Sequence, residues 1–114
     1  MLSTAQALDL WRIGMVEGLR RDAPDLTARQ LALLLTVYLT PPPHTVRALA
    51  GELRMSKPAV TRALDRLGAL GLARRKRDEA DRRNVLVQRT VKGSVYLSDF
   101  AEAVTRALDA LAGQ

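Results

Sequence analysis

The residues of this chain whose types and spacing can do chemistry are basic, and they are concentrated in one stretch. Residues 54–92 hold 12 of the 18 lysines and arginines but only 4 of the 12 acidic residues, a local charge of +8 within a total of +6. Guanidinium and ammonium groups at this density attract phosphate. A basic stretch in an otherwise slightly acidic chain is typical of a nucleic-acid-binding face. A solvated charged surface or affinity for an acidic membrane would give the same composition.

The first basic group lies on a predicted helix that Ser56 caps and that holds Pro58 in its first turn. At 100° per residue, the inward stripe is apolar and comprises Val60, Ala63, Leu64 and Leu67. The opposite face carries Pro58, Thr61, Arg62, Asp65 and Arg66. An amphipathic helix with a merely solvated outer face has the same pattern.

An α-helix fits the DNA major groove, and its N-terminal half reaches the base edges. We therefore expect Arg62 to bind a guanine through two hydrogen bonds and Thr61 to contact a thymine methyl group or a phosphate. Ser56, Lys57 and Arg66 are better placed for phosphates, and Pro58 shares their face.

The second basic group is a predicted β-hairpin. Arg74, Arg75, Lys76 and Arg77 form one strand and its end, and residues 78–83 form a tip with charges of both signs. An arginine at such a tip can enter a DNA minor groove, where the negative potential is strong. Asp81 repels phosphate, so we interpret it as the residue that orients a neighbouring arginine by a charge-assisted hydrogen bond.

The elements that must position these groups follow from helical and alternating apolar patterns. We expect helices over residues 3–20, 27–39, 45–53 and 56–70, strands over 72–77 and 84–90, and a last helix over 91–112. This order predicts a mainly α protein with a small β-hairpin, a winged helix-turn-helix forming one domain over residues 1–114. The predicted centre of the core is the second helix, through Leu31, Leu34, Leu35, Tyr38 and Leu39, and His44 is expected in a loop.

Residues 26–97 resemble the MarR family of bacterial regulators. The resemblance is carried by Leu26–Gln30, Leu49–Arg62, Asp65–Leu67, Gly71–Leu72, the D-x-x-D-R-R motif at Asp78–Arg83, and Thr90–Gly93. It implies a dimer with each fourth helix in a major groove and each hairpin at a flanking minor groove. It also implies that Arg83 enters that groove, that Asp81 positions it, and that Arg82 meets the backbone. Family members usually act as repressors, and many respond to small ligands, although nothing in this sequence identifies one.

The chain departs from the family pattern at Val91, where proline is common, and by ending after one C-terminal helix. Dimerisation is therefore expected to use the terminal helices, at about 3–20 and 91–112. The residues expected at this interface are Leu8, Trp11, Tyr96, Phe100, Val104, Leu108 and Leu111.

Several functions have no residues to support them. The chain has no cysteine and one histidine, so disulfides, thiol chemistry and a zinc site are not expected. No nucleophile elbow or phosphate-binding glycine loop is present, which predicts neither an enzyme nor a cofactor. The longest apolar stretch, residues 31–39, is too short for a membrane span, and the N-terminus lacks the basic start of a signal peptide. These features favour a cytoplasmic protein associated with the nucleoid.

The leading hypothesis is a sequence-specific regulator that binds double-stranded DNA, acting as a repressor. Two alternatives stay open. A winged helix can serve as a protein–protein interaction module, and a basic winged helix can coat the chromosome without sequence preference. The charge of +8 disfavours the first alternative, and only the ratio of specific to random affinity separates the second from a regulator.

Overall fold

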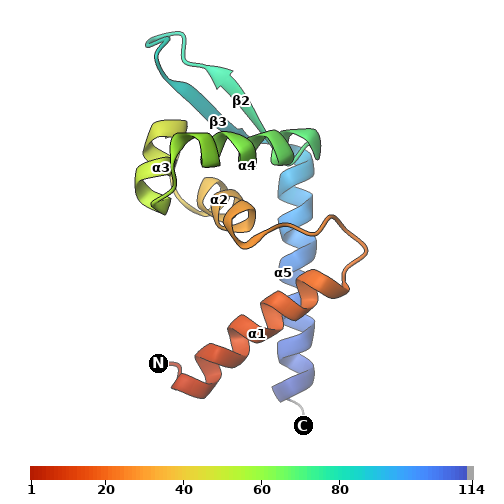
Figure 1. Ribbon diagram of the computed structural model, residues 1–114. Helices are drawn as coiled ribbons and strands as arrows, with labels where there is room; N and C mark the ends of the chain where they lie inside the picture. The colour runs from red at the N-terminus through yellow and green to blue at the C-terminus, as the bar shows by residue number, and fades with distance from the viewer. Residues whose placement is uncertain (113–114) are drawn as a thin grey trace. The chain divides into compact units, whose positions relative to one another are not determined.

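The computed structural model describes residues 1–112, and the chain forms two compact units (Figure 1). Residues 26–95 make up the first unit. Residues 1–25, together with residues 96–112, make up the second. The order of elements is that expected from the sequence, with one short strand added.

Helix α2 (Ala28–Leu39) is the centre of the first unit. It begins at a capping box, in which the Thr27 hydroxyl accepts from the Gln30 backbone N–H and the Gln30 side chain accepts from the Thr27 N–H. Its fully buried side chains are Leu33, Leu34 and Val37. The predicted core face was therefore wrong in part, since Leu39 is 75% exposed. The helix is apolar around most of its circumference, so periodicity alone could not orient it.

Helices α3 (Val46–Leu53) and α4 (Lys57–Ala69) follow, joined by a turn at residues 54–56. The hydroxyl of Thr45 caps α3 through the Ala48 N–H, and that of Ser56 caps α4 through the Ala59 N–H. The inward stripe predicted for α4, comprising Val60, Ala63, Leu64 and Leu67, is buried. Its outer face is therefore left to solvent.

Strands β2 (Ala73–Arg77) and β3 (Val85–Arg89) pair antiparallel, with Ala73 opposite Arg89 and Arg77 opposite Val85. We call these strands and the intervening residues 78–84 the wing, which projects beyond α2, α3 and α4 (Figure 1). The sequence did not predict β1 (His44–Thr45), which pairs with the other edge of β3 and makes a three-stranded sheet. His44 is consequently buried in this strand rather than in a loop. A two-residue strand after a proline run carries no periodic signal.

The Tyr38 hydroxyl ties the base of the wing to α2, beside the Arg89 guanidinium of β3, which donates to the Val37 carbonyl at 2.9 Å. The Tyr38 side chain accepts from the Thr90 N–H at 2.8 Å and donates to the Leu72 carbonyl at 2.8 Å. The Thr90 hydroxyl donates to the Gly71 carbonyl at 2.7 Å and accepts from the Gly93 N–H at 2.9 Å. These bonds fix both ends of the wing against the helices that bury the core.

The second unit consists of α1 (Thr4–Arg20) and the part of α5 (Val91–Ala112) from Tyr96 onward. The guanidinium of Arg21 lies over the rings of Tyr96, at 4.5 Å, and Phe100, at 5.1 Å, and donates to the Tyr96 carbonyl. Ile13 is buried, whereas a stripe of apolar side chains elsewhere on α1 is exposed. That stripe comprises Leu8, Trp11, Met15 and Leu19.

Candidate nucleic-acid interface

The outer face of α4 is an exposed polar surface. Lys57, Pro58, Thr61, Arg62 and Arg66 are all exposed on it, as the sequence predicted. Ser56 is exposed at its start, with its oxygen accepting from the Ala59 N–H and its hydroxyl proton left to donate. The face therefore presents two arginines, a lysine and two hydroxyl groups to solvent.

The strand of four basic residues divides its side chains between two faces, because strand side chains alternate. Arg75 turns toward α4, where its guanidinium lies 2.6 Å from the Asp65 carboxylate. Arg74 donates to the Gln88 side chain of β3 at 3.3 Å. The Asp65–Arg75 ion pair joins the outer face of α4 to the wing, and sequence reasoning did not foresee it. Arg75 is thus held in place by an acid rather than left entirely to a ligand.

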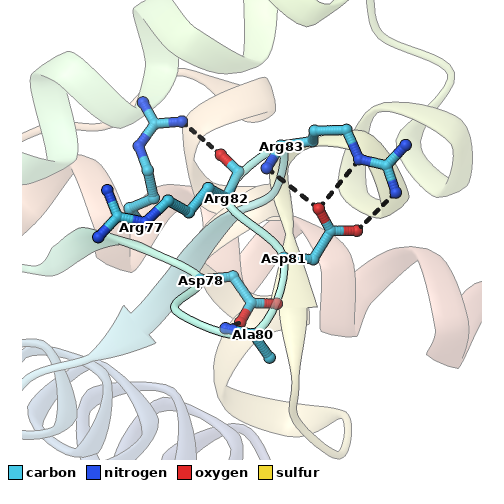
Figure 2. Close-up of polar contacts among 6 residues, drawn as sticks. All are labelled: Arg77, Asp78, Ala80, Asp81, Arg82 and Arg83. Atoms are coloured by element: carbon cyan, nitrogen blue, oxygen red, sulfur yellow. Dashed lines mark hydrogen bonds and ion pairs between the residues drawn. The ribbon is translucent and has the colours of Figure 1, made fainter.

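The tip of the wing is shaped by its own polar groups (Figure 2). Arg77 donates to the Arg82 carbonyl at 2.6 Å, and the Asp78 side chain accepts from the Ala80 N–H at 2.9 Å. Backbone bonds join Asp78 to Asn84 and Asn84 to Asp81. Arg77 therefore braces the tip from the end of β2 while staying exposed, and Arg82 and Arg83 are the exposed basic side chains of the tip itself.

Asp81 holds Arg83 through three hydrogen bonds (Figure 2). Its carboxylate accepts from Nε and Nη2 of the guanidinium, both at 3.0 Å, and from the Arg83 backbone N–H at 3.2 Å. The side chain of Arg83 is nevertheless 90% exposed. Hydrogen bonds from the Arg83 side chain and then its backbone, with a smaller contribution from the charge of Arg47, lower the pKa of Asp81, and the same pair raises the pKa of Arg83.

All twelve residues that the sequence assigned to DNA binding lie in the unit of residues 26–95 and are exposed. They are Ser56, Lys57, Pro58, Thr61, Arg62, Arg66, Arg74, Arg75, Lys76, Arg77, Arg82 and Arg83. Sequence reasoning gave no role to Arg29 and Arg54, which line a surface cavity together with Arg62. Nor did it give one to Arg47, near enough to the wing tip to act on Asp81.

The residues expected at a dimer interface fall into two groups. Leu8 and Trp11 are exposed on α1, whereas Tyr96 and Phe100 are half-buried against Arg21 of the same chain. Val104 and Leu108 are half-buried on α5, and Leu111 is 39% exposed.

Other kinds of site find no support over residues 1–112. This part of the chain has no cluster of histidine, aspartate and glutamate that could hold a metal ion. None of the helices described there is long and apolar enough to cross a membrane.

The comparisons with known proteins bear on the family and the fold. A family model described as MarR family matches residues 25–84, which is more than half of the chain and includes α2, α3, α4, β2 and the wing tip. The chain belongs to the MarR family. MarR-family proteins are DNA-binding transcriptional regulators rather than enzymes. A sequence comparison with curated proteins finds no match.

Solved MarR-type structures share the fold over nearly the whole chain. The transcriptional regulator Tm0710 from Thermotoga maritima is 26% identical, with a TM-score of 0.77 over 94% of this chain and 75% of that one. A MarR mutant from E. coli in complex with operator DNA is 26% identical, with a TM-score of 0.72 over 90% of this chain and 71% of that one. RV1404 from Mycobacterium tuberculosis, at 20% identity, has a TM-score of 0.80 over 100% of this chain and 82% of that one. The winged helix-turn-helix is therefore the fold of this MarR-family chain.

Proposed function

We propose that this MarR-family chain is a sequence-specific regulator that binds double-stranded DNA as a homodimer and represses transcription. The observation that carries the proposal is the pairing of an exposed basic face on α4 with a braced basic wing, joined by the Asp65–Arg75 ion pair. The E. coli MarR structure similar to this one holds operator DNA. A protein that acts on a bacterial chromosome works in the cytoplasm, at the nucleoid.

In the proposed complex α4 lies in the major groove. Arg62 reads a guanine, because its planar fork can donate to two acceptors on one base edge. Lys57, Arg66 and the Ser56 hydroxyl bind phosphates, while Thr61 and Pro58 pack against the groove. The charges of β2 add attraction for the backbone without reading sequence.

The wing lies at the flanking minor groove, where Arg83 inserts and Arg82 meets the backbone. Asp81 selects the direction of the Arg83 side chain before DNA arrives, which lowers the conformational entropy lost on binding. Insertion is most favourable where the minor groove is narrow, as in A·T-rich sequence.

Replacing Arg83 by alanine should therefore weaken binding most on duplexes with A·T-rich flanks, and an equal loss on G·C-rich flanks would contradict insertion.

Dimerisation is proposed to cover the exposed stripe of α1, with Leu8 and Trp11, and the apolar residues of α5 from Tyr96 to Leu111. A two-fold dimer places two recognition helices on two half-sites of one operator. Because the two subunits are linked, binding of both half-sites also raises the affinity for the operator far above that of a monomer.

The decisive experiment compares two labelled duplexes by fluorescence anisotropy at several salt concentrations. One duplex comes from upstream of the protein's own gene, and the other is a scrambled sequence of equal length. We expect the upstream duplex to bind ~10³-fold or more tightly than the scrambled one, with affinity falling steeply as salt rises. Equal binding to both, also when tested on a pool of genomic fragments, would instead favour a chromosome-coating protein. No binding to any DNA at low salt would favour a protein-interaction module.

A further inference from the structure

A basic cavity lies on one flank of α4. Most of the residues that line it belong neither to the outer face of α4 nor to the wing. It has a volume of about 460 Å³ and is formed by the start of α2, the turn before α4, and α4 itself. Three arginines line it, namely Arg29, Arg54 and Arg62. All three are exposed, and within residues 1–112 none forms an ion pair with a carboxylate. We call these three residues and their hollow the basic cavity.

The backbone of Arg54 has a conformation that disfavours arginine at this position. Arg54 ends α3 with φ 52° and ψ 45°, the left-handed region that residues with a Cβ disfavour. It is the one non-glycine residue with positive φ among those the structure describes, and the corresponding position after α4 is Gly71, with φ 74°. Backbone geometry alone would favour glycine at both places. What arginine adds at position 54 is its side chain, which lines the cavity.

The location of the cavity indicates what it meets when α4 is bound to DNA. An α-helix with its side chains is about 10–12 Å across and so fills a major groove about 12 Å wide. The sugar–phosphate chains border that groove, so groups on the flanks of the helix face phosphates rather than bases. Arg62 belongs both to the outer face of α4 and to the rim of the cavity, which places the cavity on such a flank.

We propose that the basic cavity binds one phosphate of the DNA backbone that borders the major groove, held chiefly by Arg54 with Arg29 beside it. This inference rests on the proposed function and adds a contact to it. The two guanidinium groups supply paired N–H donors that match the oxygens of a phosphodiester, whose single negative charge they neutralise. The contact carries no sequence information, so it should strengthen binding to every duplex alike.

The test uses the full chain and replaces Arg54 in three ways. Arg54→Gly and Arg54→Asn remove the charge and suit a left-handed backbone, so both variants should fold with a thermal midpoint equal to or above that of the unmodified protein. Arg54→Lys keeps the charge but loses the planar fork. The matched control is Arg106→Ala, which removes an exposed arginine from the unit that the proposal leaves out of the DNA contact.

Binding is measured by fluorescence anisotropy against salt concentration, on the upstream duplex and on its scrambled counterpart. For Arg54→Gly and Arg54→Asn we expect roughly tenfold weaker binding to both duplexes at low salt. The slope of log affinity against log salt should become shallower by about 1.8, because the bound dimer loses one phosphate contact, worth about 0.9, in each subunit. Arg54→Lys should keep the slope and lose less affinity, and Arg106→Ala should change neither quantity.

Unchanged affinity and slope in both uncharged variants would overturn the inference. So would a loss confined to the upstream duplex, because a phosphate contact cannot distinguish sequences. If replacing Arg62 or Arg83 still weakens binding in that case, the proposed function stands and only the basic cavity's role fails. If the unmodified protein binds neither duplex nor a pool of genomic fragments, the proposed function and this inference fail together.

Discussion

At the scale of single residues, base reading and phosphate binding can be separated by the ratio of specific to random affinity. Replacing Arg62 by alanine should cost ~1–3 kcal/mol for each half-site of the specific duplex and little on scrambled DNA, because the bidentate contact to guanine exists on one sequence only. Replacing Arg66 by alanine serves as the control. It should weaken binding to both duplexes equally and make the salt slope shallower by about two, one for each subunit of the bound dimer. Anisotropy titrations measure both variants, and equal losses for Arg62→Ala on the two duplexes would contradict base reading.

The Asp81–Arg83 pair makes a prediction that needs no DNA. Hydrogen bonds from Arg83 lower the pKa of Asp81. The ion pair is therefore fully formed at pH values above the ordinary aspartate pKa of about 3.9, and it is lost as the pH falls through the lowered pKa. The orientation of Arg83 should therefore be constant from pH 5 to 8. Replacing Arg83 by glutamine should raise the Asp81 pKa toward its ordinary value, as followed by carboxyl ¹³C NMR.

Arg82→Gln is the control for that titration, because within residues 1–112 no hydrogen bond or ion pair joins the Arg82 side chain to Asp81, and the Arg82 carbonyl that Arg77 uses is kept. It should leave the Asp81 titration where it is. An unchanged Asp81 titration in Arg83→Gln would show that the pair does not form in solution.

At the scale of elements, the first turn of α5 packs so closely that one position admits only glycine. A Cβ at Gly93 would collide with the Tyr38 hydroxyl and the Leu72 carbonyl, whose hydrogen bond helps to tie the wing to α2. Because one of them is backbone, the collision cannot be relieved by a rotamer change. We expect Gly93→Ala to lower the free energy of unfolding by about 3 kcal/mol.

Gly51→Ala is the matched control, because Gly51 lies in α3 and an added Cβ would meet nothing within 4 Å beyond its chain neighbours and the adjoining backbone of that helix. It should raise the free energy of unfolding by ~0.5–1 kcal/mol, since alanine favours the helix. Urea denaturation at one fixed protein concentration measures both variants. Equal changes of the same sign in the free energy of unfolding would mean that close packing of Gly93 against Tyr38 does not contribute to stability.

The elements themselves could be predicted where short-range signals specify them. Ser3, Thr27, Thr45 and Ser56 each cap the helix that follows, and each is a residue type that favours this position. Strand β1 could not be found in this way, because it forms only by pairing with residues some forty positions later. The buried face of α2 was misplaced for a related reason: only tertiary packing selects one side of a helix that is apolar on most sides.

The same division holds for the site. The outer face of α4 and the charge of the wing follow from helical spacing and composition, whereas the contacts between elements do not. The Asp65–Arg75 ion pair and the basic cavity bring together residues from separate elements. No local pattern marks Arg29 or Arg54, and the left-handed backbone at Arg54 appears only in three dimensions.

At the scale of the whole molecule, the exposed stripe of α1 predicts the state of association. Trp11 and Leu19 are each 72% exposed, beside Leu8 and Met15 on the same helix. Such a stripe is unusual on a surface that meets only water. If two copies bury it, a carboxylate at its centre must be desolvated without a partner, which is strongly unfavourable. We expect Trp11→Glu to raise the dimer dissociation constant by roughly a hundredfold or more.

Leu39→Glu is the control for that substitution, because Leu39 is equally exposed, at 75%, and the charge change is the same, but it lies on α2 outside the proposed interface. Sedimentation equilibrium should show Leu39→Glu as a dimer and Trp11→Glu as a monomer at micromolar concentration. The monomer should also lose most of its affinity for the upstream duplex, because it can bind only one half-site. It should keep weak binding to random DNA, because it retains its own phosphate contacts. A monomeric unmodified protein, or a Trp11→Glu variant as dimeric as the control, would contradict the assignment of this stripe to the dimer.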